Sequence, residues 1–124
     1  SEALQMYRRM VFNIVARIHD DHTKNFGFCL EKNDKWKLAP AFDIAYSYKP
    51  DSPWVNAHQL SLNGKRDGFT KVDLLIPAET FHKEAMNIID EVVDVVSDWE
   101  RYAKQADVFP ALSSEIKHAH RLNF

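Results

Sequence analysis

Residues 19–46 read HDDHTKNFGFCLEKNDKWKLAPAFDIAY, and this stretch is the most informative part of the sequence about the fold. Its middle part holds two runs in which aromatic or aliphatic residues alternate with small or charged ones, on either side of the turn-forming pair Asn33-Asp34. Such alternation around a short turn is typical of a β-hairpin. We therefore expect a hairpin over residues 26–39, with Pro40 ending the second strand because proline cannot donate to a strand ladder.

Apolar residues recur at helical spacing on both sides of the hairpin, which predicts amphipathic helices before and after it. We expect a first helix over residues 3–18 and a short second helix that begins at a Thr70–Asp73 capping box. A long third helix should run from Pro77 to about residue 105. After a break at Pro110, we expect a last helix that is capped by Ser113 or Ser114 and runs to about residue 122. The fold class is therefore mainly α with one small β-hairpin. The length of 124 residues fits a single domain over residues 1–124.

Composition and charge exclude several classes of protein. The formal net charge is −2, which gives no electrostatic footprint for nucleic acid or an anionic membrane. No apolar run approaches the roughly 18 residues of a membrane-spanning helix. The single cysteine, Cys29, excludes an intrachain disulfide, and its neighbours Phe28 and Leu30 indicate a small strand residue. We expect a cytoplasmic protein that binds neither nucleic acid nor membrane directly.

Polar residues concentrate where the chain enters and leaves the hairpin, at Asp20–Asn25 and at Asp43. Because a tight hairpin brings its two ends together, we expect Asp20, Asn25 and Asp43 to surround one pocket. Phosphoryl transfer uses such a set: one carboxylate orients the attacking hydroxyl, while a carboxylate and an amide oxygen hold Mg²⁺. Only Asp20 stands five residues before Asn25, which is the spacing between the catalytic aspartate and the metal-binding asparagine in the loop of protein kinases. We therefore expect Asp21 to project toward solvent or the loop backbone. Substitution of any of these loop carboxylates should leave the fold intact.

The histidines of this stretch also suggest metal chemistry of another kind. A His19-Asp20 doublet occurs in HD-type phosphohydrolases, but that site needs a further histidine on an earlier helix, and none precedes His19. A zinc site made from His19 and His22 lacks cysteine or further nearby histidine ligands. Both interpretations are therefore disfavoured.

Three segments together resemble the HipA-like serine/threonine kinases: DDHTKNFGF over residues 20–28, WKLAPAFDI over residues 36–44 and HQLSLNGK over residues 58–65. The resemblance covers most of the chain and is tightest over residues 19–46. It implies the helical C-terminal lobe of a kinase-like fold, and ATP- and Mg²⁺-dependent phosphorylation of a protein serine or threonine. Members of that family are toxin kinases of toxin–antitoxin pairs, usually encoded beside a DNA-binding antitoxin, and their known targets include aminoacyl-tRNA synthetases.

The same resemblance implies roles for individual residues. Asp20 corresponds to the catalytic aspartate. Asn25 and Asp43 correspond to the metal ligands that hold ATP with its Mg²⁺, and an amide and a carboxylate oxygen are ligands that this ion prefers. His22 and Lys24 correspond to residues that shape the loop or contact the phosphate side of the site.

Two departures from ordinary protein kinases bear on these roles. Ile44, and not glycine, follows Asp43, which matches the HipA-like pattern better than the eukaryotic one. The chain shows no Gly-rich phosphate loop and no strand lysine, so we expect the N-terminal lobe to be absent from it and these residues alone to be inactive. Two alternatives stay open. One is a non-catalytic lobe that binds an antitoxin or another protein; the other is a phosphoinositide-kinase-like lipid kinase, which also uses an Asp-x-His-x-x-Asn loop, although the residues around Asp43 argue against it.

Overall fold

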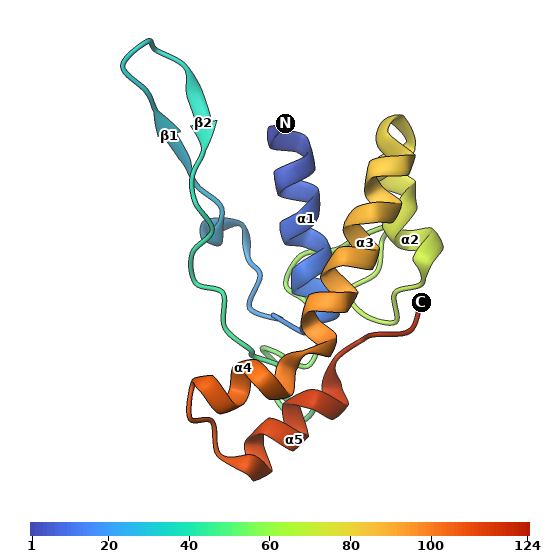
Figure 1. Cartoon of the computed structure of the whole chain (residues 1–124). Helices are drawn as coiled ribbons and strands as arrows, with labels where there is room; N and C mark the ends of the chain where they lie inside the picture. Colours follow the sequence, from blue (N-terminus) through green and yellow to red (C-terminus); the bar gives the residue numbers. More distant parts are fainter.

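Figure 1 shows the computed structural model, which describes all 124 residues. The elements are, in order, α1 (Glu2–Val15), η1 (Thr23–Asn25), β1 (Phe28–Leu30), β2 (Trp36–Leu38), α2 (Lys71–Leu75), η2 (Ile76–Phe81), α3 (His82–Ser97), α4 (Trp99–Gln105) and α5 (Pro110–Ala119), where η marks a 3-10 helix. The expected fold class, mainly α with one small hairpin, is confirmed. None of these helices combines the length and the apolar character that crossing a membrane requires.

The core lies between α1 and α3, which run side by side (Figure 1). Apolar residues at helical spacing form one stripe on each helix, so the two stripes bury each other and leave the charged residues in solvent. The stripe of α1 includes Val11 and Val15, and that of α3 includes Ile89. The hydroxyl of Tyr7 donates to the carbonyl of Leu74 at 2.7 Å, which fastens α2 to the same core.

β1 and β2 form a hairpin that projects away from the helices (Figure 1). The strands are antiparallel, with Phe28 opposite Leu38 and Leu30 opposite Trp36. Because opposite residues of an antiparallel pair share a face, these four apolar side chains lie on one face of the hairpin. Phe28, Leu30 and Trp36 are largely exposed. Cys29 lies in β1, as the sequence predicted, and its thiol is free.

The prediction of one long helix from Pro77 to about residue 105 is wrong, because three separate helices, η2, α3 and α4, cover this range. Pro77 lies at the start of η2, and Ala78 has non-helical dihedral angles (φ −106°, ψ 20°). α3 then ends where Asp98 leaves the helical conformation (φ −90°, ψ 20°). The hydroxyl of Ser97 donates to the carbonyl of Asp94 at 2.6 Å. A serine side chain that bonds a carbonyl of the preceding turn competes with the backbone ladder, and this one does so directly before the break.

The start of the last helix also differs from expectation. α5 begins at Pro110 itself, and neither Ser113 nor Ser114 caps it. Proline suits the first position of a helix because its ring fixes φ near the helical value and its missing N–H would have no partner there. After Ala119 the chain is extended and returns to α1, where the N–H of Arg121 donates to the carbonyl of Val15 at 2.9 Å.

Candidate functional site

The end of α1 delivers the loop that carries Asp20. Arg17 adopts a left-handed conformation (φ 57°), and the N–H of Ile18 donates to the carbonyl of Asn13 at 2.9 Å. This bond closes the helix in the manner of a Schellman motif, here without glycine. The buried side chains of Ile18 and His19 then hold the start of the loop in the protein interior.

Side-chain hydrogen bonds shape the loop from Asp20 to Asn25. The amide Nδ2 of Asn25 donates to the carbonyl of Asp20 at 2.9 Å, and the N–H of Asp20 donates to Ser47 Oγ at 3.0 Å. These bonds leave the carboxylate of Asp20 free, with its side chain 55% exposed. They also leave the amide oxygen of Asn25 as its side-chain acceptor for a ligand.

Asp43 reaches the same place from the other end of the hairpin. The N–H of Ala39 donates to the carbonyl of Gly27 at 2.8 Å, so the two ends of the hairpin meet. A Cβ at Gly27 would stand 3.4 Å from the ring of Phe42, so this ring packs directly against the base of the hairpin. Asp43 itself has a positive φ of 54°, a conformation that aspartate adopts more readily than most residues. The packing of Phe42 therefore sets where Asp43 lies.

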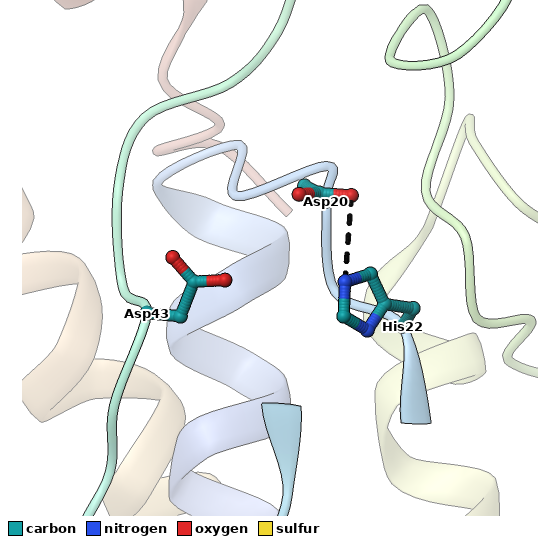
Figure 2. Close-up of side chains that lie close together, drawn as sticks. All are labelled: Asp20, His22 and Asp43. Carbon is teal, nitrogen blue, oxygen red and sulfur yellow. Dashed lines mark ion pairs between the residues drawn. The ribbon is translucent and has the colours of Figure 1, made fainter. Parts of the chain in front are cut away.

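Figure 2 shows the side chains of Asp20, His22 and Asp43 gathered around one space. One ligand atom from each lies within 4.8 Å of the other two. Nε2 of His22 stands 3.9 Å from Oδ1 of Asp20, and no lysine or arginine pairs with either aspartate. Two carboxylates so placed repel each other, and a cation bound between them would remove that repulsion. The two carboxylates therefore suit a hard divalent cation such as Mg²⁺, whereas the imidazole of His22 is not a ligand that such an ion prefers.

The structure places the predicted site residues unequally. Asp20 and Asp43 come together from the two ends of the hairpin, and His22 contributes Nε2 to the same cluster. Asn25 holds the loop through its amide, as described above. Lys24 is exposed and makes no hydrogen bond or ion pair. Asp20 and Asp43 are both exposed, so the cluster is open to solvent.

Asp21 differs from its neighbour, and the expectation that it is one more exposed loop carboxylate is wrong. Its side chain is 8% exposed. Oδ1 accepts from the N–H of Gln59 at 2.8 Å, and Oδ2 lies 2.9 Å from Nδ1 of His58. The carboxylate does bind backbone, but in a segment distant along the chain. Spacing within the loop could not reveal this partner, because His58 follows 37 positions later.

His19, directly before Asp20, is buried and uncharged. Its Nδ1 lies 2.9 Å from the carbonyl of Val55. Burial, together with the nearby His58, lowers the pKa of His19 to about 4. The loop therefore begins on a neutral ring near neutral pH, and the charge of the site is concentrated in its exposed carboxylates.

These features define a class of protein, a mainly helical domain with one carboxylate-bearing loop before a short hairpin and a second carboxylate after it. The profile of the HipA-like C-terminal domain matches residues 1–99. The chain therefore belongs to the HipA-like C-terminal domain family, which confirms the resemblance seen in the sequence. No curated protein and no solved structure matches the chain significantly.

Proposed function

We propose that the chain is the C-terminal, catalytic-loop-bearing lobe of an ATP- and Mg²⁺-dependent protein serine/threonine kinase. The observation that carries the proposal is the convergence of Asp20, His22 and Asp43 at the base of the hairpin, in a chain of the HipA-like family. Catalysis of phosphoryl transfer is mostly positioning and electrostatic stabilisation, for which carboxylates and metal ligands are the required groups.

Each residue of the cluster has a role in this mechanism. The carboxylate of Asp20 has no basic partner except His22, at 3.9 Å, so it can orient the substrate hydroxyl and accept its proton. Asp43 and the amide oxygen of Asn25 would hold Mg²⁺, because the ion prefers such oxygen ligands. Bound Mg²⁺ neutralises charge on the phosphates of ATP. The imidazole of His22 lies beside the carboxylate of Asp20, and exposed Lys24 is free to contact phosphate.

The proposed kinase acts as the toxin of a toxin–antitoxin pair in the cytoplasm. Its substrate is a protein, for which an aminoacyl-tRNA synthetase is the first candidate, and its partner is a DNA-binding antitoxin. Membership of the HipA-like family supports these proposals. The residues that grip the nucleotide phosphates belong, in this proposal, to an N-terminal lobe outside residues 1–124, so residues 1–124 alone would be inactive.

Substitution of the two carboxylates in the full-length kinase tests the proposal. Asp20→Ala is expected to reduce phosphoryl transfer by on the order of 100-fold or more, as removal of a positioned general base does. Asp43→Ala should be equally damaging because it removes a metal ligand. Asp51→Ala is the matched control, since Asp51 is also exposed in a loop but lies outside the cluster. Full autophosphorylation by the Asp20 and Asp43 variants would refute the proposal.

A non-catalytic interaction lobe is the second candidate function, and the exposed hairpin favours it. Phe28, Leu30 and Trp36 are largely exposed on one face of the hairpin. Exposed apolar patches on soluble proteins often mark contacts with other proteins. If this second function is the right one, Asp20→Ala would keep the biological effect of the full-length protein, whereas Trp36→Ser would lose partner binding in a pull-down assay.

A further inference from the structure

Beneath the exposed cluster, buried polar contacts run from the loop to the C-terminal tail. Oδ1 of Asp21 accepts from the N–H groups of Gln59 at 2.8 Å and Leu60 at 3.4 Å, while Oδ2 lies 2.9 Å from Nδ1 of His58. The side chains of Asp21 and His58 are only 8% and 1% exposed. A buried carboxylate with three donors is held firmly, because any lost contact would leave charge poorly compensated in a medium of low dielectric constant.

The second ring nitrogen of His58 identifies the next member of this network. Nε2 of His58 lies 3.0 Å from Nη1 of Arg121. A guanidinium has donors only, so Nε2 must accept. Nδ1 must then carry the ring proton and donate it to Asp21. The contacts therefore fix His58 as the neutral Nδ1–H tautomer, between the guanidinium on one side and the carboxylate on the other.

Arg121 is itself anchored at the end of α1. Its Nη1 also donates to the carbonyl of Ile14 at 2.9 Å, and its backbone N–H donates to the carbonyl of Val15 at 2.9 Å. Its Nη2 pairs with Asp67, and the guanidinium-bearing side chain is 10% exposed. The network therefore closes on the last turn of the helix that delivers the loop.

Asp20 stands between two residues that this network fixes. On one side, the ring of His19 packs on that of His58, with ring centroids 4.2 Å apart. On the other side, Asp21 is held by its three donors. The carboxylate of Asp20 makes no hydrogen bond, and its nearest possible partner, Nε2 of His22, stands 3.9 Å away, so its direction depends on the backbone at residues 19–21.

We propose that Arg121 is a positioning residue for phosphoryl transfer, which acts through His58 and Asp21 to aim the carboxylate of Asp20 at the substrate hydroxyl. This inference rests on the proposed kinase function. Arg121 lies outside residues 1–99, the part that matches the family, so the C-terminal tail supplies this support.

The expected effect of losing Arg121 is on the rate of reaction more than on nucleotide binding. A displacement of about 1 Å at a catalytic group costs on the order of 100-fold in rate. Asp43, a proposed metal ligand, has no contact with Arg121, and Asn25 meets the network only through the carbonyl of Asp20, so both would still hold the nucleotide. The kcat of an Arg121 variant should therefore fall while its KM for ATP stays close to that of the wild type.

The tautomer of His58 provides a test that needs no enzyme activity. In ¹⁵N NMR spectra of residues 1–124, the ring of His58 is expected to carry its proton on Nδ1. Arg121→Met removes the donor to Nε2 and is expected to shift both that resonance and the amide resonance of Asp20. Arg101→Met is the matched control, because Arg101 is exposed on α4, and it should move neither. A proton on Nε2 of His58, or an Asp20 amide resonance that does not shift in Arg121→Met, would overturn the proposal.

Kinetics of the full-length kinase supply the second test. Arg121→Met is expected to lower kcat by roughly 10- to 100-fold with the KM for ATP changed by less than about twofold. His58→Asn keeps a donor near the position of Nδ1, so it should retain more activity than His58→Phe, which keeps the ring shape alone. Thermal melting followed by circular dichroism separates unfolding from loss of rate. A folded Arg121→Met variant with unchanged kcat would overturn the proposal. If the wild type itself transfers no phosphate, the proposed function fails. The NMR shift of the Asp20 amide in Arg121→Met then decides alone whether the network positions the loop.

Discussion

Asp20 and Asp21 are neighbours in sequence with opposite environments. Asp20 is exposed and makes no hydrogen bond through its carboxylate, whereas Asp21 is buried and accepts from three donors. An exposed carboxylate without partners stays free to meet a ligand. A buried carboxylate whose acceptors are occupied anchors the chain, since buried polar groups are nearly always paired. Asp21 therefore supports the loop, while Asp20 would contact the ligand in the proposed function.

Asp21→Ala is expected to destabilise the fold, in contrast to substitution of Asp20. The change removes the acceptor for Nδ1 of His58 and for two backbone N–H groups. Because each buried donor left unpaired costs about 1–3 kcal/mol, we expect the free energy of unfolding to fall by about 3 kcal/mol in urea denaturation. Asp51→Ala, at an exposed loop position, should change it by less than about 0.5 kcal/mol. Equal stability of the two variants would contradict the anchoring role of Asp21.

His120 is expected to make the stability of the fold depend on pH. Its ring is half-buried against the edge of Trp99, with centroids 5.7 Å apart, and its Nδ1 has no hydrogen-bond partner. Burial lowers the pKa of His120 to about 4, whereas histidine in an unfolded chain has a pKa of about 6.5. The unfolded chain therefore binds more protons between these pH values. The contribution of His120 is fully present above about pH 6.5 and is lost as the pH falls toward about 4.

His120→Phe tests this dependence, because it keeps an aromatic ring against Trp99 and removes the titrating group. Urea denaturation of the wild type should show a fall in the free energy of unfolding between about pH 7 and about pH 4.5. In the variant the fall should be smaller by about 2 kcal/mol, a figure reduced to allow for partial exposure of the ring. The buried His19, whose pKa is also about 4, contributes in the same direction in both proteins. An equally steep fall in the variant would contradict the assignment to His120.

At the scale of the elements, α2 begins at the capping box that the sequence predicted. Oγ1 of Thr70 accepts from the N–H of Asp73 at 3.4 Å, and Oδ2 of Asp73 accepts from the N–H of Thr70 at 2.8 Å. Thr70→Ala is therefore expected to lower the free energy of unfolding by about 1 kcal/mol, measured by thermal denaturation. Ser114→Ala provides the contrast, because Ser114 lies inside α5, where alanine favours the helix. A similar loss at Ser114 would contradict the observed start of α5.

The hairpin and the helices could be predicted from local sequence patterns, but the positions at which helices break could not. Alternation around Asn33-Asp34 predicted the hairpin, and helical periodicity predicted α1 and most of α3. The break at Asp98 between α3 and α4 was not predicted, because Trp99 keeps the apolar residues at helical spacing across it. Pro110 was ambiguous for a different reason, since proline can end one helix or begin the next.

The candidate site could be predicted only where its residues flank the hairpin. Asp20 and Asp43 stand at the two ends of one short motif, so hairpin geometry alone brings them together. His58 and Arg121 had no such signal. His58 lies 37 positions from Asp21, and Arg121 lies 63 positions from His58. The segment that carries His58 packs on the loop, and the tail that carries Arg121 packs on α1. Spacing along the chain does not encode packing of this kind.

At the scale of the whole molecule, α1 connects the core to the candidate site. Its apolar stripe packs against α3, and its last turn both delivers the loop of Asp20 and receives Arg121 from the tail. The hairpin, by contrast, projects from the helices and touches the site only through its base (Figure 1). The position of Asp20 is therefore tied to the core, while that of Asp43 is tied to the base of the hairpin.

Residues 1–124 alone are expected to bind ATP–Mg²⁺ weakly. Kinases hold the nucleotide phosphates with a Gly-rich loop and a strand lysine in addition to the metal ligands. The three glycines of this sequence lie apart, Gly27 at the base of the hairpin, Gly64 in a turn and Gly68 in the loop before α2, so they form no such loop. The proposed metal ligands Asn25 and Asp43 would be left to hold the nucleotide.

Isothermal titration calorimetry on residues 1–124 and on the proposed full-length kinase measures the difference. Lost phosphate contacts cost several kcal/mol, which corresponds to an affinity lower by on the order of 100-fold or more for residues 1–124. Asp43→Ala in the proposed full-length kinase is the matched comparison, because it would keep the proposed phosphate-binding lobe and removes one proposed metal ligand. ATP binding by this variant should weaken only when Mg²⁺ is present. Micromolar binding of ATP–Mg²⁺ by residues 1–124 would contradict the prediction, since it would mean that the exposed cluster of Asp20, His22 and Asp43 holds the nucleotide without a second lobe.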